Sequence, residues 1–180
     1  SCLWNITLRG RLADDDSGNY GFATTFTSNG GTGARPRGDG LSTTAYPSGV
    51  KGTPVEIAEQ IMPLIFWRKE FRPGSGGAGR TRGGLGQTIE IESGIGQPFE
   101  LLAAFDRIDH PPRGRDGGSN GAPGHVGLAS GVILKGKGTQ TIMPGERLVI
   151  ETSGGGGMGR PEERDPAAVA RDVEDGLVGK

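Results

Sequence analysis

The sequence contains a single cysteine, Cys2, among its 180 residues. One thiol cannot form an internal disulfide, so a small secreted scaffold held by disulfides is excluded and a reducing compartment is favoured. The chain also lacks the pattern of a signal peptide, and none of its apolar runs approaches the ~18 residues that could span a membrane. We therefore expect a cytoplasmic protein with no membrane-spanning segment.

An excess of either charge is also missing. Twenty basic residues face 21 acidic ones, which leaves a net charge of −1. This balance provides no bulk attraction to nucleic acid or to an anionic membrane. We therefore expect neither of them as a partner.

Glycine, in contrast, is abundant. The 36 glycines and 12 prolines make up more than a quarter of the chain, and glycine alone usually accounts for only ~7% of residues. Such a composition falls in the range where disorder must be considered. Short apolar runs at 64–67 and 148–151 recur between the glycine clusters, however, as in a folded protein with many turns. We therefore expect one folded domain, or a domain with an appendage.

Alternating and β-prone runs predict an α+β, mainly β fold, with antiparallel sheets, long glycine-rich loops and two short helices. The strands are expected at residues 3–8, 22–27, 64–71, 87–92, 99–105, 126–134, 139–143 and 147–152. Polar turns are predicted at 13–19 and 46–49, and loops at 28–40 and 106–124.

The first helix is predicted from a local capping pattern. Thr53 is a suitable N-cap, Pro54 suits the first helical position, and Glu56 would complete a capping box. The helix should be short because Pro63 cannot continue it.

The second helix is predicted within residues 160–178, as a helical appendage at the C-terminal end. Asp165 should cap its N-terminus, and Gly176 suits a left-handed stop. Val169 and Val173 form only a narrow apolar stripe. We therefore expect this helix to pack weakly, or against a surface that the chain does not contain.

Residues 70–86 are the most unusual stretch, with seven glycines and the cations Arg72, Arg80 and Arg82. Glycine lets the backbone take positive φ or approach another group closely, and the arginine fork suits carboxylate or phosphate. The stretch is therefore either a solvated, flexible loop or a backbone pressed against a ligand or partner chain of negative charge. Composition alone favours the loop.

Two further patterns point to phosphate or RNA, but only weakly. Residues 131–137 come close to a phosphate-binding loop, but Gly138 stands where Ser or Thr would hold Mg²⁺, so a hairpin turn is favoured. Residues 80–84 resemble an RGG patch for single-stranded RNA. This patch occurs once, in a chain of balanced charge, which argues against RNA binding.

Metal-ligating and nucleophilic residues form no clear constellation. Asp106, Asp109 and His110, with His125 further along, lack the His-x-x-x-His spacing of a metal site, so loop charge and surface histidines are the better account. No Ser/His/Asp or Cys/His arrangement is present, and Cys2 at the chain end is a poor nucleophile. The sequence therefore predicts no metal site and leaves the catalytic residues unknown.

Four glycine-containing segments, taken together and in order, resemble the C-terminal part of the hydantoinase B family: residues 30–40, 46–59, 70–86 and 151–178. That family includes N-methylhydantoinase B, the matching half of ATP-dependent 5-oxoprolinase, and the related acetone and acetophenone carboxylase subunits. The resemblance spans nearly the whole chain but only the C-terminal portion of a family subunit. Because the chain also starts at Ser1 without Met, we expect it to be a piece of a longer protein.

The resemblance implies that residues 1–180 are the C-terminal region of a hydantoinase B-type subunit, which pairs with an A-type subunit carrying the ATP site. In such a hetero-oligomer, ATP phosphorylates the carbonyl oxygen of a cyclic amide or a ketone, and the activated group is hydrolysed or carboxylated. The metal site and much of the catalytic equipment of the family lie upstream. ATP and a divalent metal are therefore expected in the complete complex but not in this chain, which should be inactive alone.

Arg35, Asp39, Arg72, Arg80 and Arg82 are the candidates for binding substrate or the partner subunit, because each holds charge on a glycine-rich backbone. A second hypothesis makes the chain a structural, subunit-docking module whose glycines serve tight turns and close packing. A third, an RNA-binding loop protein, would show salt-sensitive binding.

Overall fold

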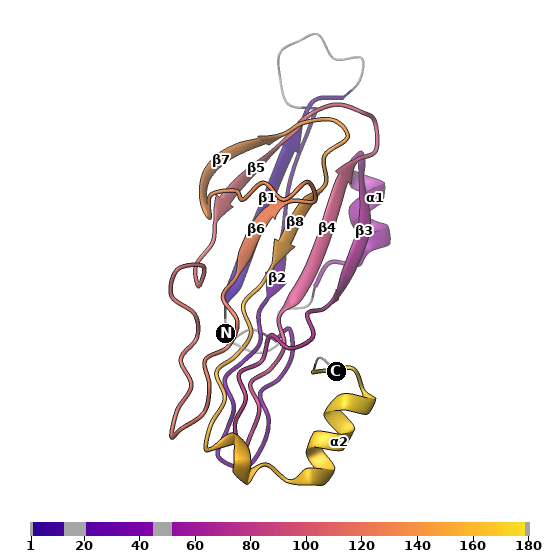
Figure 1. The fold of residues 1–180 in the computed structure, drawn as a ribbon. Helices are drawn as coiled ribbons and strands as arrows, with labels where there is room; N and C mark the ends of the chain where they lie inside the picture. Colours follow the sequence, from indigo (N-terminus) through magenta and orange to yellow (C-terminus); the bar gives the residue numbers. More distant parts are fainter. Residues whose placement is uncertain (1, 13–20, 45–51, 179–180) are drawn as a thin grey trace.

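The computed structural model describes residues 2–12, 21–44 and 52–178. They form two four-stranded antiparallel sheets, and long glycine-rich segments extend from one end of the sheets (Figure 1). The described residues also contain two short α-helices and a 3₁₀ turn, η1 (Pro161–Glu163). The predicted mainly β, α+β class is therefore confirmed. The turns predicted at 13–19 and 46–49 lie outside the described residues.

The first sheet has the strand order β2-β1-β5-β7. Its strands are β1 (Leu3–Gly10), β2 (Phe22–Asn29), β5 (Phe99–Ala104) and β7 (Lys137–Ile142). Trp4, Ile6 and Leu8 on β1 are fully buried, and the residues between them are partly or largely exposed. The alternation predicted for residues 3–8 is therefore confirmed, since successive side chains of a strand point to opposite faces.

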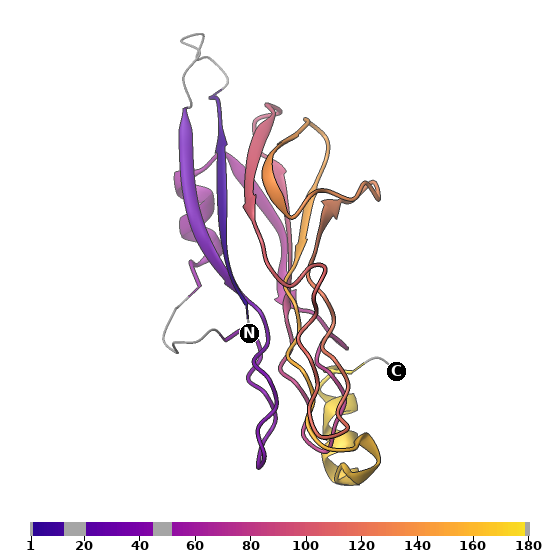
Figure 2. The same cartoon turned by 90° about the vertical axis from the view of Figure 1, so that its left-hand side faces the viewer.

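The second sheet has the strand order β3-β4-β8-β6. Its strands are β3 (Leu64–Phe71), β4 (Gln87–Ser93), β8 (Leu148–Glu151) and β6 (His125–Leu128). Ile89 and Ile91, on the strand predicted at 87–92, point inward and are fully buried. The sheets lie face to face (Figure 2), and an edge-to-face contact between Phe26 and Phe66, with ring centroids 5.6 Å apart, joins them.

The strand predicted at 126–134 is too long. β6 ends at Leu128, and the chain turns back through Gly131, whose φ is +94°. The amide of Leu128 donates to the carbonyl of Val132 at 2.8 Å, which closes the turn. β7 rather than a helix begins at Lys137, so residues 131–137 do not form a phosphate-binding loop. The predicted hairpin between the flanking strands is wrong as well, because β6 pairs with β8 and β7 pairs with β5 in the other sheet.

The first helix, α1 (Val55–Ile61), ends before Pro63 as predicted, but its capping prediction is wrong. Pro54, not Thr53, is the N-cap, and no side chain caps the helix. Pro54 has a ψ of 142°, so it lies outside the helical region instead of occupying the first helical position. The carbonyl of Thr53 accepts a hydrogen bond from Lys69 Nζ on β3.

The second helix, α2 (Pro166–Glu174), is capped as predicted. The Asp165 side chain accepts from the Ala167 amide at 3.1 Å, and Gly176 follows the helix with a φ of +67°. Val169 and Val173 are each 44% exposed, so they form little of the packing of α2. None of the described helices has the length and apolar content needed to cross a membrane.

Four glycine-rich segments run side by side below the sheets, and we call them the glycine bundle: residues 30–41, 72–86, 112–124 and 152–159 (Figures 1 and 2). The central segment, 153–157, is buried throughout. Its partners recur at every third residue: Gly31 and Ala34 donate to the carbonyls of Ser153 and Gly156, and Gly154 and Gly157 donate to those of Ala122 and Ser119. Three residues per turn is the period of an extended polyproline II-type helix. Different faces of the central segment therefore meet different neighbours.

Glycine is required in the central segment because backbone presses on backbone. A Cβ added at Gly154 would lie 1.8 Å from the carbonyl oxygen of Ser75, and one at Gly155 would lie 1.8 Å from that of Thr32. No side chain fits at such distances. The close approach of bare backbone is made here to other segments of the same chain.

Candidate functional site

All five charged residues singled out in the sequence lie in the glycine bundle, but they do not form one site. Arg72 lies where the bundle meets the second sheet. Its Nη2 is 3.0 Å from Glu151 Oε2, and its Nη1 donates to the carbonyl of Pro123 at 2.7 Å. The guanidinium of Arg72 therefore connects its own segment to those that contain Pro123 and Glu151.

Asp39 and Arg82 belong to a second group, the arginine–aspartate network, which consists of Asp39, Arg82, Arg164 and Asp172. Arg164 donates to both carboxylate oxygens of Asp39 at 2.8 Å and to Asp172 Oδ2 at 2.7 Å. Arg82 Nε lies 3.3 Å from the same Asp172 oxygen. Bidentate hydrogen bonds between arginine and carboxylate are among the stronger and more directional polar contacts. The network therefore fastens α2 to the bundle.

The contacts within the network favour the ionised forms of Asp39 and Arg164. Burial acts to raise the pKa of the Asp39 carboxyl, but the hydrogen bonds from the Arg164 side chain and the Arg82 amide outweigh it, and the pKa lies below its ordinary value. The bond to Asp39, helped by that to Asp172, raises the pKa of Arg164. Two guanidiniums face two carboxylates, so the network carries no net charge to offer a ligand.

Arg35 and Arg80 are the accessible members of the predicted set. Arg35 is exposed and donates from Nη2 to the carbonyl of Asp39 at 2.9 Å. The Arg80 side chain is 49% exposed, with Nη1 3.8 Å from Glu163. Such a distance in water gives a weak ion pair, so both guanidiniums can still meet another molecule.

A cleft of about 580 Å³ opens on the flank of the bundle, and sequence reasoning missed it. We call it the cationic cleft; it is lined by Gly33, Arg107, His110, Pro111, Pro112, Arg113, Arg115, Asn120 and Gly156. Its arginines fall in the segment that we expected to be only a loop, 106–124. The available signal was three arginines within residues 107–115, but the spacing of charges in a loop does not show where they point.

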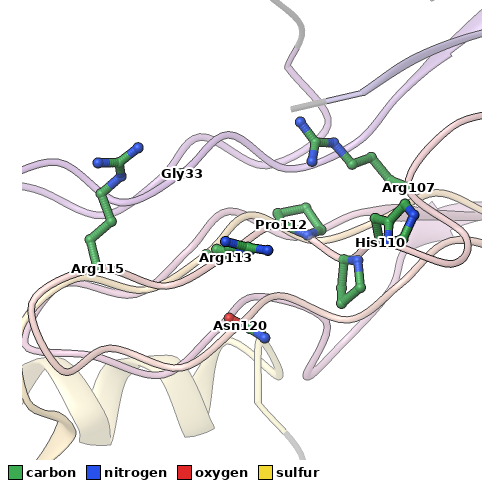
Figure 3. Close-up of a pocket in the computed structure, with 9 residues that line it drawn as sticks. Gly33, Arg107, His110, Pro112, Arg113, Arg115 and Asn120 are labelled. Atoms are coloured by element: carbon green, nitrogen blue, oxygen red, sulfur yellow. The ribbon is translucent and has the colours of Figure 1, made fainter.

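Figure 3 shows how the arginines are arranged. Arg107 and Arg115 extend from the same loop toward the segment that carries Gly33, and Arg113 lies between them. No carboxylate lines the cleft. Within the described part of the chain, none of these three guanidiniums forms an ion pair or a hydrogen bond. The cleft is therefore a concentration of uncompensated positive charge.

Two of the residues that were weighed as metal ligands in the sequence, Asp106 and His110, have other surroundings in the structure. Asp106 Oδ1 accepts a hydrogen bond from Trp4 Nε1 at 3.0 Å, and His110 lines the cationic cleft. No group of three or more His, Cys, Asp or Glu side chains among residues 2–12, 21–44 and 52–178 is placed to hold a metal ion.

Comparisons with known proteins relate the chain to one family. The family model described as Hydantoinase B/oxoprolinase matches residues 1–161. A 5-oxoprolinase 1 from Arabidopsis thaliana is 36% identical over 163 residues, which cover 88% of this chain and 12% of the relative. The caprolactamase subunit beta of Pseudomonas jessenii is 32% identical over 139 residues, covering 69% of this chain and 22% of the relative.

Solved structures share the fold. ATP-dependent caprolactamase from Pseudomonas jessenii superposes with a TM-score of 0.72 at 24% identity, over 98% of this chain and 33% of that one. Nucleotide-free acetone carboxylase superposes with a TM-score of 0.71 at 22% identity, over 98% of this chain and 28% of that one. The chain thus spans less than a third of the length of the curated relatives described above.

Proposed function

Because the chain belongs to the hydantoinase B/oxoprolinase family, we propose that it is part of an ATP-dependent enzyme that hydrolyses cyclic amides in the cytoplasm. One observation carries this proposal: the chain is 36% identical to a 5-oxoprolinase and 32% identical to a caprolactamase subunit. Both substrates named by these relatives, 5-oxoproline and caprolactam, are lactams. The shared chemistry is therefore opening of the C–N bond in a cyclic amide.

The complete enzyme would contain an A-type subunit that binds ATP, together with a divalent metal. The name of the relative, a caprolactamase subunit beta, fits a hetero-oligomer. ATP would supply a phosphoryl group to the lactam carbonyl oxygen. A first water would add at that carbon and the ring C–N bond would break, giving the free amine and an acyl phosphate, and a second water would hydrolyse the acyl phosphate to the carboxylate and inorganic phosphate. A ketone carboxylase subunit is the variant of this proposal that the acetone carboxylase fold neighbour suggests.

Within this enzyme, residues of the chain divide into two proposed roles. Asp39, Arg72 and Arg82 hold the bundle and α2 in position, since their charges are matched inside the chain. Arg35 and Arg80 contact the substrate or the A-type subunit, because their guanidiniums remain accessible. Residues 160–178 form an appendage that the bundle carries at its side.

The test uses the complete complex, with its A-type subunit, and follows ATP-coupled opening of 5-oxoproline and caprolactam. Arg80→Ala and Arg35→Ala should each lower turnover or assembly, whereas Arg171→Ala should not. Arg171 is an exposed arginine of α2 whose side chain forms no ion pair or hydrogen bond within the described residues. Failure of the assembled complex to open any lactam in the presence of ATP would overturn the proposed activity.

A second candidate function is a structural module that docks the A-type subunit and contributes no group to the reaction. It is favoured by the internal pairing of Asp39, Arg72 and Arg82 and by the internal packing of the glycines. Pull-down with the A-type subunit separates the two. If Arg80→Ala weakens capture but leaves turnover of the fully assembled complex unchanged, the docking role holds.

A further inference from the structure

We propose that the cationic cleft binds a phosphate-bearing small molecule. This inference concerns a site distinct from the five candidates discussed above and does not depend on the reaction proposed for the complete enzyme. Its first support is charge. Three arginines and a histidine line the cleft without a carboxylate, in a chain whose net charge is −1. Positive charge gathered in a concave site attracts anions even when the whole protein is nearly neutral.

The second support comes from polar groups that lack an acceptor. Gly156 is buried and lines the cleft, yet its amide donates no hydrogen bond within the described residues, although the amides of Gly154, Gly155 and Gly157 all do. Buried backbone N–H groups are nearly always paired. Asn120 Oδ1 accepts from the Gly114 amide at 3.0 Å, and its amide nitrogen likewise has no acceptor in the described chain. Both donors belong to residues that line the cleft.

The third support is the backbone that carries the arginines. Arg107 has a φ of +61°, a left-handed conformation that residues with a side chain rarely adopt. Its carbonyl is fixed by the Gly124 amide at 2.8 Å. Pro111 and Pro112 follow on the cleft wall, and their rings restrict the backbone further. The loop therefore holds its arginines in a defined arrangement before any ligand arrives.

The ligand class follows from size and geometry. A volume of about 580 Å³ is within the range of small-molecule pockets. A guanidinium presents paired donors that match the oxygens of phosphate, and three of them suit a group with more than one negative charge. Inorganic phosphate, pyrophosphate and the diphosphate of a nucleotide share this chemistry, so the experiment must distinguish them.

The test is calorimetric titration of the full-length subunit with inorganic phosphate, pyrophosphate and ADP as separate probes. We expect at least one of them to bind, with an affinity that falls as salt is raised. Arg113→Ala and Arg115→Ala should each raise Kd at least tenfold. A preference for ADP over pyrophosphate would identify a nucleotide, and equal binding of the two would identify the phosphates alone.

The matched control is Arg37→Ala. Arg37 is another exposed arginine of the bundle, with no ion pair in the described chain, and it lies outside the cleft. Its removal should change Kd less than twofold, and the melting temperatures of all three variants should match the parent because these side chains are exposed. The proposal is overturned if none of the probes binds, if Arg37→Ala weakens binding as much as Arg113→Ala, or if an acidic peptide binds where the phosphates do not.

Discussion

The two halves of the molecule are held together by different forces. One half is the sandwich formed by the two sheets. It has one continuous hydrophobic core, which includes Trp4, Phe99 and Ile150. In the described part of the glycine bundle, Leu85 is the only buried hydrophobic side chain, and backbone hydrogen bonds at every third residue connect the segments. The sandwich is therefore stabilised by side-chain burial, and the bundle by the fit of main chain against main chain.

This difference determines which changes each half tolerates. A side-chain core loses contacts when a methyl group is removed, but its neighbours can partly relax. A backbone packed against a backbone cannot rotate away from an added methyl group. Adding one carbon atom in the bundle should therefore lower the free energy of unfolding more than removing one carbon atom from the sandwich.

The largest effect is expected from Gly155→Ala. Its Cβ would lie 1.8 Å from the carbonyl oxygen of Thr32, and that contact can be relieved only by separating the two segments. We expect a loss on the order of 3 kcal/mol or more in the free energy of unfolding, measured by urea denaturation of the purified protein. In the same variant, the backbone amide hydrogens of the central segment should exchange faster with solvent.

Gly33→Ala is the control within the same bundle. A Cβ at Gly33 has only one neighbour within 4 Å, the carbonyl oxygen of Gly156 at 3.9 Å, and the residue is exposed. Its unfolding free energy should change by less than about 0.5 kcal/mol. Similar losses in Gly33→Ala and Gly155→Ala would show that close packing of the central segment is not what stabilises the bundle.

Asp172→Asn should produce the next largest effect, confined to α2. The substitution keeps the shape of the side chain but leaves the buried guanidinium of Arg82 without a carboxylate partner. Breaking a buried pair from one side costs about 3–5 kcal/mol, and the remaining bond between Arg164 and Asp39 should reduce this to about 2 kcal/mol. Tryptic cleavage at Arg164 and Arg171 should become faster.

Asp175→Asn provides the matched control for this prediction, since Asp175 is exposed at the end of the same helix. Its cleavage rate should equal that of the parent. If Asp172→Asn also leaves cleavage unchanged, the network does not hold α2 against the bundle.

Ile150→Val tests the other half of the comparison with a smaller change. Ile150 is fully buried on β8, where it pairs in register with Ile89 and Val126. Loss of one methyl group should lower the unfolding free energy by about 1 kcal/mol, measured by the same urea titration. A loss greater than that of Gly155→Ala would reverse the comparison between the two halves.

The sandwich could be predicted from the sequence because strands with one buried face carry a recognisable pattern of apolar residues. The alternating and β-prone residues at 3–8 and 87–92 predicted β1 and β4, and Pro63 predicted the end of α1. The prediction was wrong at residues 126–134, where an apolar run continues through a turn that depends on Gly131. It was also wrong at Thr53, because a capping sequence does not fix the backbone of the proline that follows.

The bundle could not be predicted in the same way, since glycine has no side chain whose burial could alternate. For residues 70–86 the composition favoured a flexible loop and left close backbone approach as the alternative, and it did not indicate that Ser153–Gly157, far along the chain, would be the neighbour. The arginine–aspartate network joins Asp39 to Arg164 across 125 positions. The cationic cleft depends likewise on the loop at 107–115 meeting Gly33 and Gly156. Such long-range pairings leave no local signal.

The smallest expected effect is a dependence of stability on acid that arises in the arginine–aspartate network. Among the described residues, the two buried charged side chains are Arg82 and Asp172, both in the arginine–aspartate network. The pKa of Asp39 is lowered in the folded state, so its stabilising contribution is complete above its ordinary value of 3.8 and is lost as the pH falls through the lower, folded value. The side chain is 34% exposed, so solvent screening limits the contribution to less than about 1 kcal/mol.

Asp39→Asn should therefore lower the unfolding free energy more at pH 6 than at pH 2, because the contribution of the parent carboxylate is lost as the pH falls through its lowered pKa. Urea titrations at the two pH values give both numbers, and hydrogen exchange of the α2 amides shows where the loss occurs. Because the cost lies in the contact between Arg164 and the bundle, exchange should accelerate in α2 while β1 and β8 stay protected. Equal acceleration in both halves would mean that the sandwich and the bundle unfold as one unit, and that their different packing does not make them independent.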